Sequence, residues 1–223
     1  MAMAVARLRD TMEDMRALAI IDLQNDFCPG GPLAVRHGDE VVPVANRLSP
    51  LFPLVVASQD WHPPEHGSFA RNRPGRQPYE LDELGGLPQV LWPAHCVQGT
   101  HGAAFHRAFD RTHVTRVFQK GTDPAIDSYS AFYDNGRRKS TGLADYLREQ
   151  SVRELTIMGL ATDYCVRFTA LDGLWLGFDI IVVEDGCRAV ELADGDGARA
   201  IDEMRSAGAT ILSSDAALRT PNR

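Results

Sequence analysis

The sequence of 223 residues lacks the features that mark membrane and nucleic-acid-binding proteins. No apolar run approaches the roughly 20 residues that a membrane-spanning helix needs, so we expect no membrane partner. The formal net charge is −7, and the densest basic cluster is only Arg137-Arg138-Lys139. This balance argues against a nucleic-acid partner. The chain also has no internal repeat, low-complexity tract or linker, which favours a single domain.

Cysteine is scarce and scattered. The chain has four cysteines, which form no CxxC pair: Cys28, Cys96, Cys165 and Cys187. Disulfides stay possible with an even number, but we recognise no secretory signal. The pattern therefore favours a reduced, cytoplasmic setting in which one or more thiols are functional.

The first residues carry little hydrophobic periodicity. Residues 1–15 include four methionines and resemble either a short surface helix, a disordered extension or an upstream translation start. We expect an N-terminal extension over residues 1–15 and one domain over residues 16–223.

Short apolar runs recur along the chain and alternate with helical patterns, which predicts an α/β fold. The runs are nearly continuous rather than alternating, as in strands that are covered on both faces. They are Ala17–Leu23, Leu54–Ser58, Val114–Gln119, Glu154–Gly159, Asp179–Val183 and Ala209–Leu212. The helical patterns cover Asp39–Leu48, Thr141–Gln150, Asp163–Leu176 and Ala198–Ala207. Such alternation implies right-handed crossovers and a parallel sheet between two helical layers.

One segment does not follow this alternation. Gln59–His113 is rich in Pro and Gly, has no convincing periodicity and contains six of the seven histidines. Loops longer than about 15 residues in a compact domain are usually functional or disordered. Disorder would not need such a density of histidine and aromatic residues, so we predict a binding loop.

Three reactive residue types stand at the ends of predicted strands: Asp22, Lys120 and Cys165. The carboxyl ends of parallel strands face one crevice, so these side chains can meet there. Cys165 would lie at the start of a helix, whose positive end favours a thiolate. Lys120 would favour that thiolate and Asp22 would accept the thiol proton. The alternatives are a turn cap for Asp22, a solvated strand end for Lys120 and a core position for Cys165.

The predicted loop also contains a candidate metal site. In Asp60-Trp61-His62, residues i and i+2 of an extended segment project to the same side. With His95, they form a set of two histidines and one carboxylate that suits a divalent transition metal ion. His66 lies four residues after His62, and Cys96, beside His95, is a weaker candidate.

Aromatic residues accompany both candidate sets. Phe27 follows the Asp22 segment, Trp92 precedes His95, and Tyr129 follows Lys120 in Asp127-Ser128-Tyr129. They are candidates to line a pocket for a flat ring. The alternative is that they only anchor the core or the loops.

These residues lie in motifs that resemble the nicotinamidases of the isochorismatase-like cysteine hydrolase superfamily. The motifs occur in the family's order between about Arg16 and Ser214. They are Ile21-Asp22-Leu23-Gln24-Asn25-Asp26-Phe27, Asp60-Trp61-His62-Pro63, Trp92-Pro93-Ala94-His95-Cys96, Gln119-Lys120-Gly121 and Gly159-Leu160-Ala161-Thr162-Asp163-Tyr164-Cys165-Val166.

The resemblance implies a three-layer α/β/α fold with a six-stranded parallel sheet. It also implies hydrolysis of nicotinamide to nicotinate and ammonia in NAD salvage, with pyrazinamide as a further substrate. Cys165 would be the nucleophile, Asp22 the acid/base and Lys120 its electrostatic partner. A cis Leu160-Ala161 bond would let the Ala161 and Cys165 N–H groups form an oxyanion hole.

The resemblance assigns the metal site to Asp60, His62 and His95, and leaves His66 as a ligand that only some members use. Zinc is the expected ion, and iron or manganese would also suit these ligands. Phe27, Trp92 and Tyr129 would contact the substrate. The sequence leaves open whether the protein forms a homo-oligomer.

Two other functions stay open at this stage. A sister amidohydrolase would act on a carbamoyl or ureido compound, but such substrates have no ring nitrogen for a metal to coordinate. A metal-binding or regulatory protein could keep the fold without catalysis, although Asp22, Lys120 and Cys165 are all present.

Overall fold

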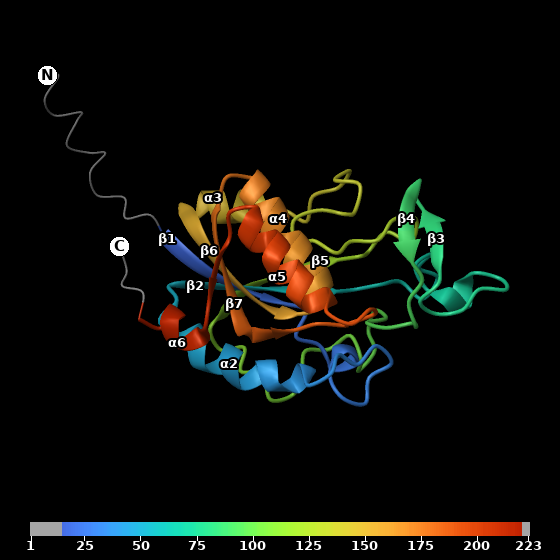
Figure 1. Cartoon of the computed structure of the whole chain (residues 1–223), viewed down its shortest axis with the longest axis horizontal. Coiled ribbons are helices and arrows are strands. Elements are labelled where there is room, and N and C mark those ends of the chain that lie inside the picture. The colour runs from blue at the N-terminus through green and yellow to red at the C-terminus, as the bar shows by residue number, and fades with distance from the viewer. Residues whose placement is uncertain (1–14, 220–223) are drawn as a thin grey trace, which may run out of the picture.

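Six parallel strands form the centre of the molecule (Figure 1). The structure is a computed structural model that describes residues 15–219. The strands lie in the order β5-β2-β1-β6-β7-β8. Their bounds are β1 Met15–Ile21, β2 Leu54–Asp60, β5 Val114–Lys120, β6 Val152–Leu160, β7 Asp179–Arg188 and β8 Thr210–Leu212. The predicted parallel sheet is confirmed, and each predicted run contributes a strand.

Helices cover both faces of this sheet, as the α/β/α prediction requires. In Figure 1, α3, α4 and α5 lie on one face, and α2 and α6 lie on the other. Their bounds are α2 Val41–Leu48, α3 Leu143–Glu149, α4 Arg167–Trp175, α5 Asp196–Ser206 and α6 Ser214–Ala217. Within residues 15–219, no helix combines the length and the apolar character needed to cross a membrane.

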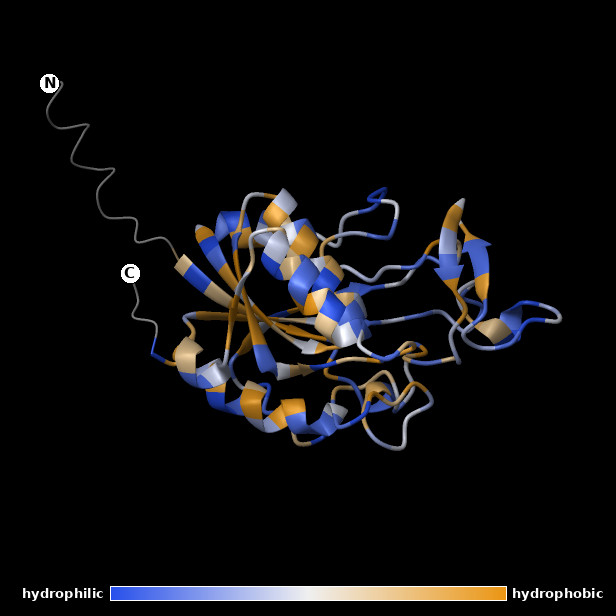
Figure 2. Cartoon of the chain, viewed as in Figure 1, coloured by the Kyte–Doolittle hydropathy of each residue, from blue (hydrophilic) through white to orange (hydrophobic). Residues whose placement is uncertain are grey.

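The central strands are buried on both faces. Hydrophobic residues predominate along them in Figure 2, and Leu18, Ile20 and Leu155 are completely buried. Each such side chain contributes roughly 1.5–3 kcal/mol through its burial. This explains why the sequence shows continuous apolar runs rather than alternation.

Two boundaries differ from the sequence prediction. The predicted extension over residues 1–15 lies outside the described residues except for Met15, which is the first residue of β1. The predicted helix over 163–176 has two parts, because Thr162–Val166 forms one turn of π-helix before α4. In that turn the Val166 amide donates to the Ala161 carbonyl at 3.1 Å.

The long segment between β2 and β5 is ordered and contains a small hairpin. Its strands are β3 Leu81–Leu84 and β4 Leu87–Val90, which pair in antiparallel fashion. Figure 1 shows this hairpin projecting beyond one end of the main sheet. Sequence periodicity did not identify it, because four residues are too few to establish a pattern.

The two halves of the sheet meet between β1 and β6. From β1, the chain adds β2 and β5 on one side, while β6, β7 and β8 extend the other side. At such a switch point, the loops that follow adjacent strands diverge and leave a crevice at the carboxyl ends. Ile21 pairs with Gly159 where these two strands end.

Gly159 permits the close approach of β1 and β6 at this point. Its φ is +131°, and a Cβ atom there would lie 2.1 Å from the Ile21 carbonyl oxygen. We expect Gly159→Ala to lower the free energy of unfolding by at least about 3 kcal/mol, because backbone atoms of β1 must move. Chemical denaturation measures this loss.

Gly177→Ala is the matched control for this substitution. Gly177 also has a positive φ, +88°, but no atom lies within 4 Å of its added Cβ. Only the conformational cost of about 1 kcal/mol applies there. Equal losses for the two variants would contradict a steric role for Gly159.

Candidate active site

The crevice brings together reactive side chains from four strands. Asp22 directly follows β1, Asp60 ends β2 and Lys120 ends β5. Cys165 lies in the π-helical turn that follows β6. All four residues are buried. The structure therefore places the acid, the amine and the thiol in one cluster, as the sequence pattern predicts.

Lys120 is the centre of this cluster. Its Nζ donates to Asp60 Oδ1 at 2.7 Å, to the Ser128 carbonyl at 2.9 Å and to Cys165 Sγ at 3.4 Å. Its Nζ also lies 2.9 Å from Asp22 Oδ2. Burial alone would lower the pKa of Lys120, but Asp22 and Asp60 outweigh it and raise that pKa well above its usual value. The side chain is therefore a fixed positive charge.

Asp22 is placed to receive a proton. It is fully buried, and its Oδ1 accepts a hydrogen bond from the Ser58 hydroxyl at 2.7 Å. The three ammonium hydrogens of Lys120 are directed to other acceptors, so Asp22 Oδ2 has an ion pair but no aligned hydrogen bond. Burial raises the pKa of Asp22, although Lys120 opposes the rise. A carboxylate of this kind is a competent general base.

The expectation that Cys165 rests as a thiolate is wrong. Burial raises the pKa of Cys165 well above its usual value, and the charges of Asp22 and Asp60 raise it further. Lys120 lowers it but does not compensate for them. A helix terminus has less influence than complete burial beside two carboxylates. The thiol therefore keeps its proton at rest, and Asp22, which shares the Lys120 ammonium with Cys165, is the base available to remove it.

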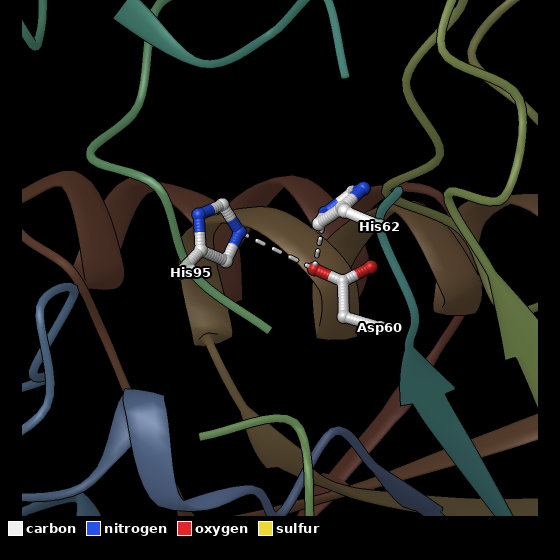
Figure 3. A group of neighbouring side chains, drawn as sticks. All are labelled: Asp60, His62 and His95. Atoms are coloured by element: carbon white, nitrogen blue, oxygen red, sulfur yellow. Dashed lines mark hydrogen bonds and ion pairs between the residues drawn. The ribbon is translucent and has the colours of Figure 1, made fainter. Parts of the chain in front are cut away.

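The predicted metal ligands also lie together, as Figure 3 shows. Asp60 Oδ2 is 3.1 Å from His62 Nε2 and 3.5 Å from His95 Nε2. His62 Nδ1 lies 2.9 Å from the Gly121 carbonyl and His95 Nδ1 lies 2.8 Å from the Pro93 carbonyl. These bonds orient both rings so that Nε2 faces the shared carboxylate, the arrangement found around bound transition metals. The three residues fit one divalent ion.

His66 lies beside this group. It is completely buried, its Nδ1 is 2.7 Å from the Ser68 hydroxyl, and its Nε2 has no hydrogen-bond partner. Ligand atoms of His62, His66 and Asp127 lie within 4.8 Å of one another. His62 belongs to both groups, and the Gly121 carbonyl engages its Nδ1, which leaves Nε2 for an ion. Asp60, His95 and Asp127 also line one pocket.

A pocket opens onto both the thiol and the cation ligands. It encloses about 340 Å³, including its open mouth. Its lining contains all three aromatic residues predicted from the sequence, Phe27, Trp92 and Tyr129. It also contains residues that the sequence did not identify as pocket residues: Leu33, Asp127, Tyr164 and Val190. Asp60, His95, Ala161 and Cys165 complete it. The wall is mostly apolar and aromatic, which suits a small flat ring.

The family assignment follows from comparison with known proteins. The isochorismatase domain matches residues 16–216. This chain belongs to the isochorismatase family. It is 54% identical over 200 residues to the nicotinamidase of Escherichia coli strain K12, which covers 88% of this chain and 93% of that protein.

Two solved structures of this family extend the comparison. The nicotinamidase pyrazinamidase of Acinetobacter baumanii superposes with a TM-score of 0.89 at 42% identity, covering 93% of this chain and 100% of that one. The pyrazinamidase of Pyrococcus horikoshii in complex with zinc gives a TM-score of 0.72 at 37% identity. It covers 89% of this chain and 98% of that one.

Membership of the isochorismatase family agrees with two expectations from the motifs. The predicted α/β/α fold is confirmed, and the Leu160-Ala161 peptide bond is cis. Cys96, the weaker metal candidate, belongs to neither ligand group among residues 15–219. Its amide instead donates to Asp26 Oδ2 at 2.7 Å.

The site also depends on residues that the motif analysis did not assign. Gln24 pairs with the Asp60 backbone through two hydrogen bonds of 2.8 Å, which fixes the end of β2. Asp163 accepts the Val190 and Glu191 amides at 2.9 Å each and so holds Val190 in the pocket wall. Gln24 and Asp163 both lie within the quoted motifs, so their place in these motifs could have identified them as residues that support the site.

Lys120→Met is expected to make Cys165 less reactive. Lys120 supplies the one nearby charge that lowers the pKa of the thiol, so its loss raises that pKa further. Alkylation of Cys165 by iodoacetamide at pH 8 should slow roughly tenfold or more, because only the thiolate reacts. Peptide mass spectrometry distinguishes Cys165 from the other three thiols.

Lys139→Met provides the control, since Lys139 is the chain's other lysine and its side chain is exposed. Circular dichroism checks that both variants are folded. Wild-type alkylation rates in Lys120→Met across the pH range would remove Lys120 from the catalytic set.

Proposed function

We propose that the protein is a metal-dependent nicotinamidase that converts nicotinamide to nicotinate and ammonia in NAD salvage. One observation carries the proposal: a thiol paired with an acid and an amine shares a ring-sized pocket with a divalent-ion ligand set. The names of the Escherichia coli and Acinetobacter relatives support it. Pyrazinamide, a similar flat amide, is the proposed second substrate. Cytoplasmic location and homo-oligomer formation stay predictions.

The mechanism begins with proton transfer inside the cluster. Asp22 takes the Cys165 proton while Lys120 stabilises the thiolate that forms. The sulfur attacks the carboxamide carbon, and the Ala161 and Cys165 N–H groups donate hydrogen bonds that stabilise the negatively charged oxygen. Asp22 then returns the proton to the nitrogen, so ammonia leaves and a thioester remains.

Hydrolysis of the thioester regenerates the enzyme. Asp22, again a carboxylate, removes a proton from a water molecule that attacks the same carbonyl carbon. The carbon–sulfur bond breaks, nicotinate forms, and the thiol recovers its proton from Asp22. Lys120 keeps its charge throughout, because its pKa is raised far above neutral pH.

Asp60, His62 and His95 are the proposed ligands of the ion, with His66 as a further candidate. When bound, the ion would supply a Lewis acid for the ring nitrogen of the substrate. Zinc is the proposed metal, in keeping with the zinc complex of the Pyrococcus relative, and iron or manganese suit the same ligands. Phe27, Trp92 and Tyr129 hold the ring against the pocket wall.

Zinc-reconstituted protein should release ammonia from nicotinamide, and Cys165→Ala should reduce turnover at least about a thousandfold. The reason is that no other thiol lines the pocket among residues 15–219. Cys187→Ala, at a buried thiol outside the pocket, is the control. A ureido substrate tests the sister amidohydrolase activity. Absence of ammonia from nicotinamide would refute the proposed function.

His95→Ala and Asp60→Asn should separate ion binding from nucleophile activation. Each should weaken zinc binding more than about 100-fold and abolish nicotinamide turnover. In the presence of a chelator, His95→Ala should alkylate at Cys165 like wild type, because Lys120 and Asp22 are untouched. Asp60→Asn should alkylate faster, because the Asp60 charge raises the pKa of the thiol.

Zinc content, steady-state rates and alkylation kinetics measure the three properties. Full turnover in a zinc-depleted His95→Ala variant would show that the ion is incidental. Loss of Cys165 alkylation in that variant would show that the ligand segment organises the nucleophile.

A further inference from the structure

Asp127 is a buried carboxylate with no cationic partner among residues 15–219. Only 3% of its surface is exposed. Oδ1 accepts the Ser128 amide at 2.8 Å and Oδ2 accepts Gln89 Nε2 at 2.9 Å. Both donors are neutral. A buried carboxylate without a compensating positive charge is costly, so a cation that binds in the assembled site would stabilise it.

The position of Asp127 shows where that cation would bind. Its carboxylate belongs to the ligand group with His62 and His66, and it also lines the pocket. His66 Nε2, completely buried and without a partner, belongs to the same group. Asp127 therefore shares the ligand residue His62 with Asp60 and His95 and lines the same pocket as they do, so an ion bound there would lie near its carboxylate.

The charges of the cluster agree with this placement. Three buried carboxylates, Asp22, Asp60 and Asp127, accompany one buried ammonium, Lys120. With Cys165 protonated and His62 neutral, as a metal ligand must be, these ionised groups leave two negative charges in excess, which one divalent ion neutralises. Asp60 alone is insufficient, because its Oδ1 is already paired with Lys120 at 2.7 Å.

We propose that Asp127 is the second carboxylate of the divalent-ion site, in addition to Asp60, and that Gln89 holds it there. This inference rests on the ion site of the proposed function and extends it to residues outside the motifs. Proton transfer from Cys165 to Asp22 leaves the total charge of the cluster unchanged. The cluster with Asp127 and one bound divalent ion therefore stays neutral during catalysis.

Gln89 is the positioning residue in this arrangement. It comes from β4 of the hairpin and is itself 3% exposed. Its Nε2 lies within hydrogen-bond distance of Asp127 Oδ2, of the Tyr129 hydroxyl at 3.0 Å and of the Val90 carbonyl at 2.7 Å. The hairpin thereby connects to both the ion site and the aromatic wall of the pocket.

Asp127→Asn tests the proposal, because it removes one charge while keeping the size of the side chain. Zinc affinity is measured by competition with a chromophoric chelator. We expect the dissociation constant to rise about 10- to 100-fold. Without zinc, the variant should melt at or above the wild-type temperature, because an unpaired buried charge is gone. Stabilisation by added zinc should shrink accordingly.

Asp123→Asn is the matched control. Asp123 lies on the same segment, is exposed, and caps the Ala125 amide at 2.9 Å, which asparagine can also do. The zinc affinity of the Asp123→Asn variant should equal that of wild type. Gln89→Met is a second variant, which leaves the carboxylate in place but removes its donor. It should weaken zinc binding less than Asp127→Asn does.

The outcomes are distinguishable from failure of the proposed function. If wild type binds no zinc, the ion site itself is refuted and this inference with it. If wild type binds zinc and Asp127→Asn binds it within twofold of that affinity, only the role of Asp127 is refuted. Should Asp127→Asn fail to fold, wild-type zinc affinity in Gln89→Met would refute the positioning of Asp127 by the hairpin.

Discussion

The buried ammonium of Lys120 is the interaction on which the rest of the site depends. A completely buried positive charge is tolerated only when anionic and polar partners surround it closely. Here the partners come from different strands: Asp22 after β1, Asp60 at the end of β2 and Cys165 after β6. Because each partner requires its strand to end at one place, the site can assemble only on the folded parallel sheet.

This dependence also explains why the resting thiol is neutral. Two carboxylates stabilise the ammonium, and the same carboxylates disfavour a second negative charge on sulfur. The nucleophile therefore forms only as its proton moves to Asp22, whose Oδ2 has no aligned hydrogen bond. The arrangement protects a buried thiol from forming a permanent thiolate while keeping the base within reach.

The segment between β2 and β5 supplies the other half of the site. It contributes His62, His66 and His95 and, through the hairpin, Gln89. In the proposed scheme, one divalent ion connects these residues to the sheet, since Asp60 contacts Lys120 through one oxygen and the histidines through the other. Ion binding and nucleophile activation are thus distinct but share one carboxylate.

The sequence by itself determined the fold class, the six strands and which motifs would meet at their carboxyl ends. Continuous apolar runs report burial on both faces, and parallel strands have only one edge where their ends can gather. Local pattern could not determine the hairpin, the role of Asp127 or the protonation of Cys165. A four-residue strand has no readable period, and Asp127 meets Gln89 and His66 only through contacts distant in sequence. A thiol pKa depends on burial and on charges from other strands, so only the tertiary structure decided it.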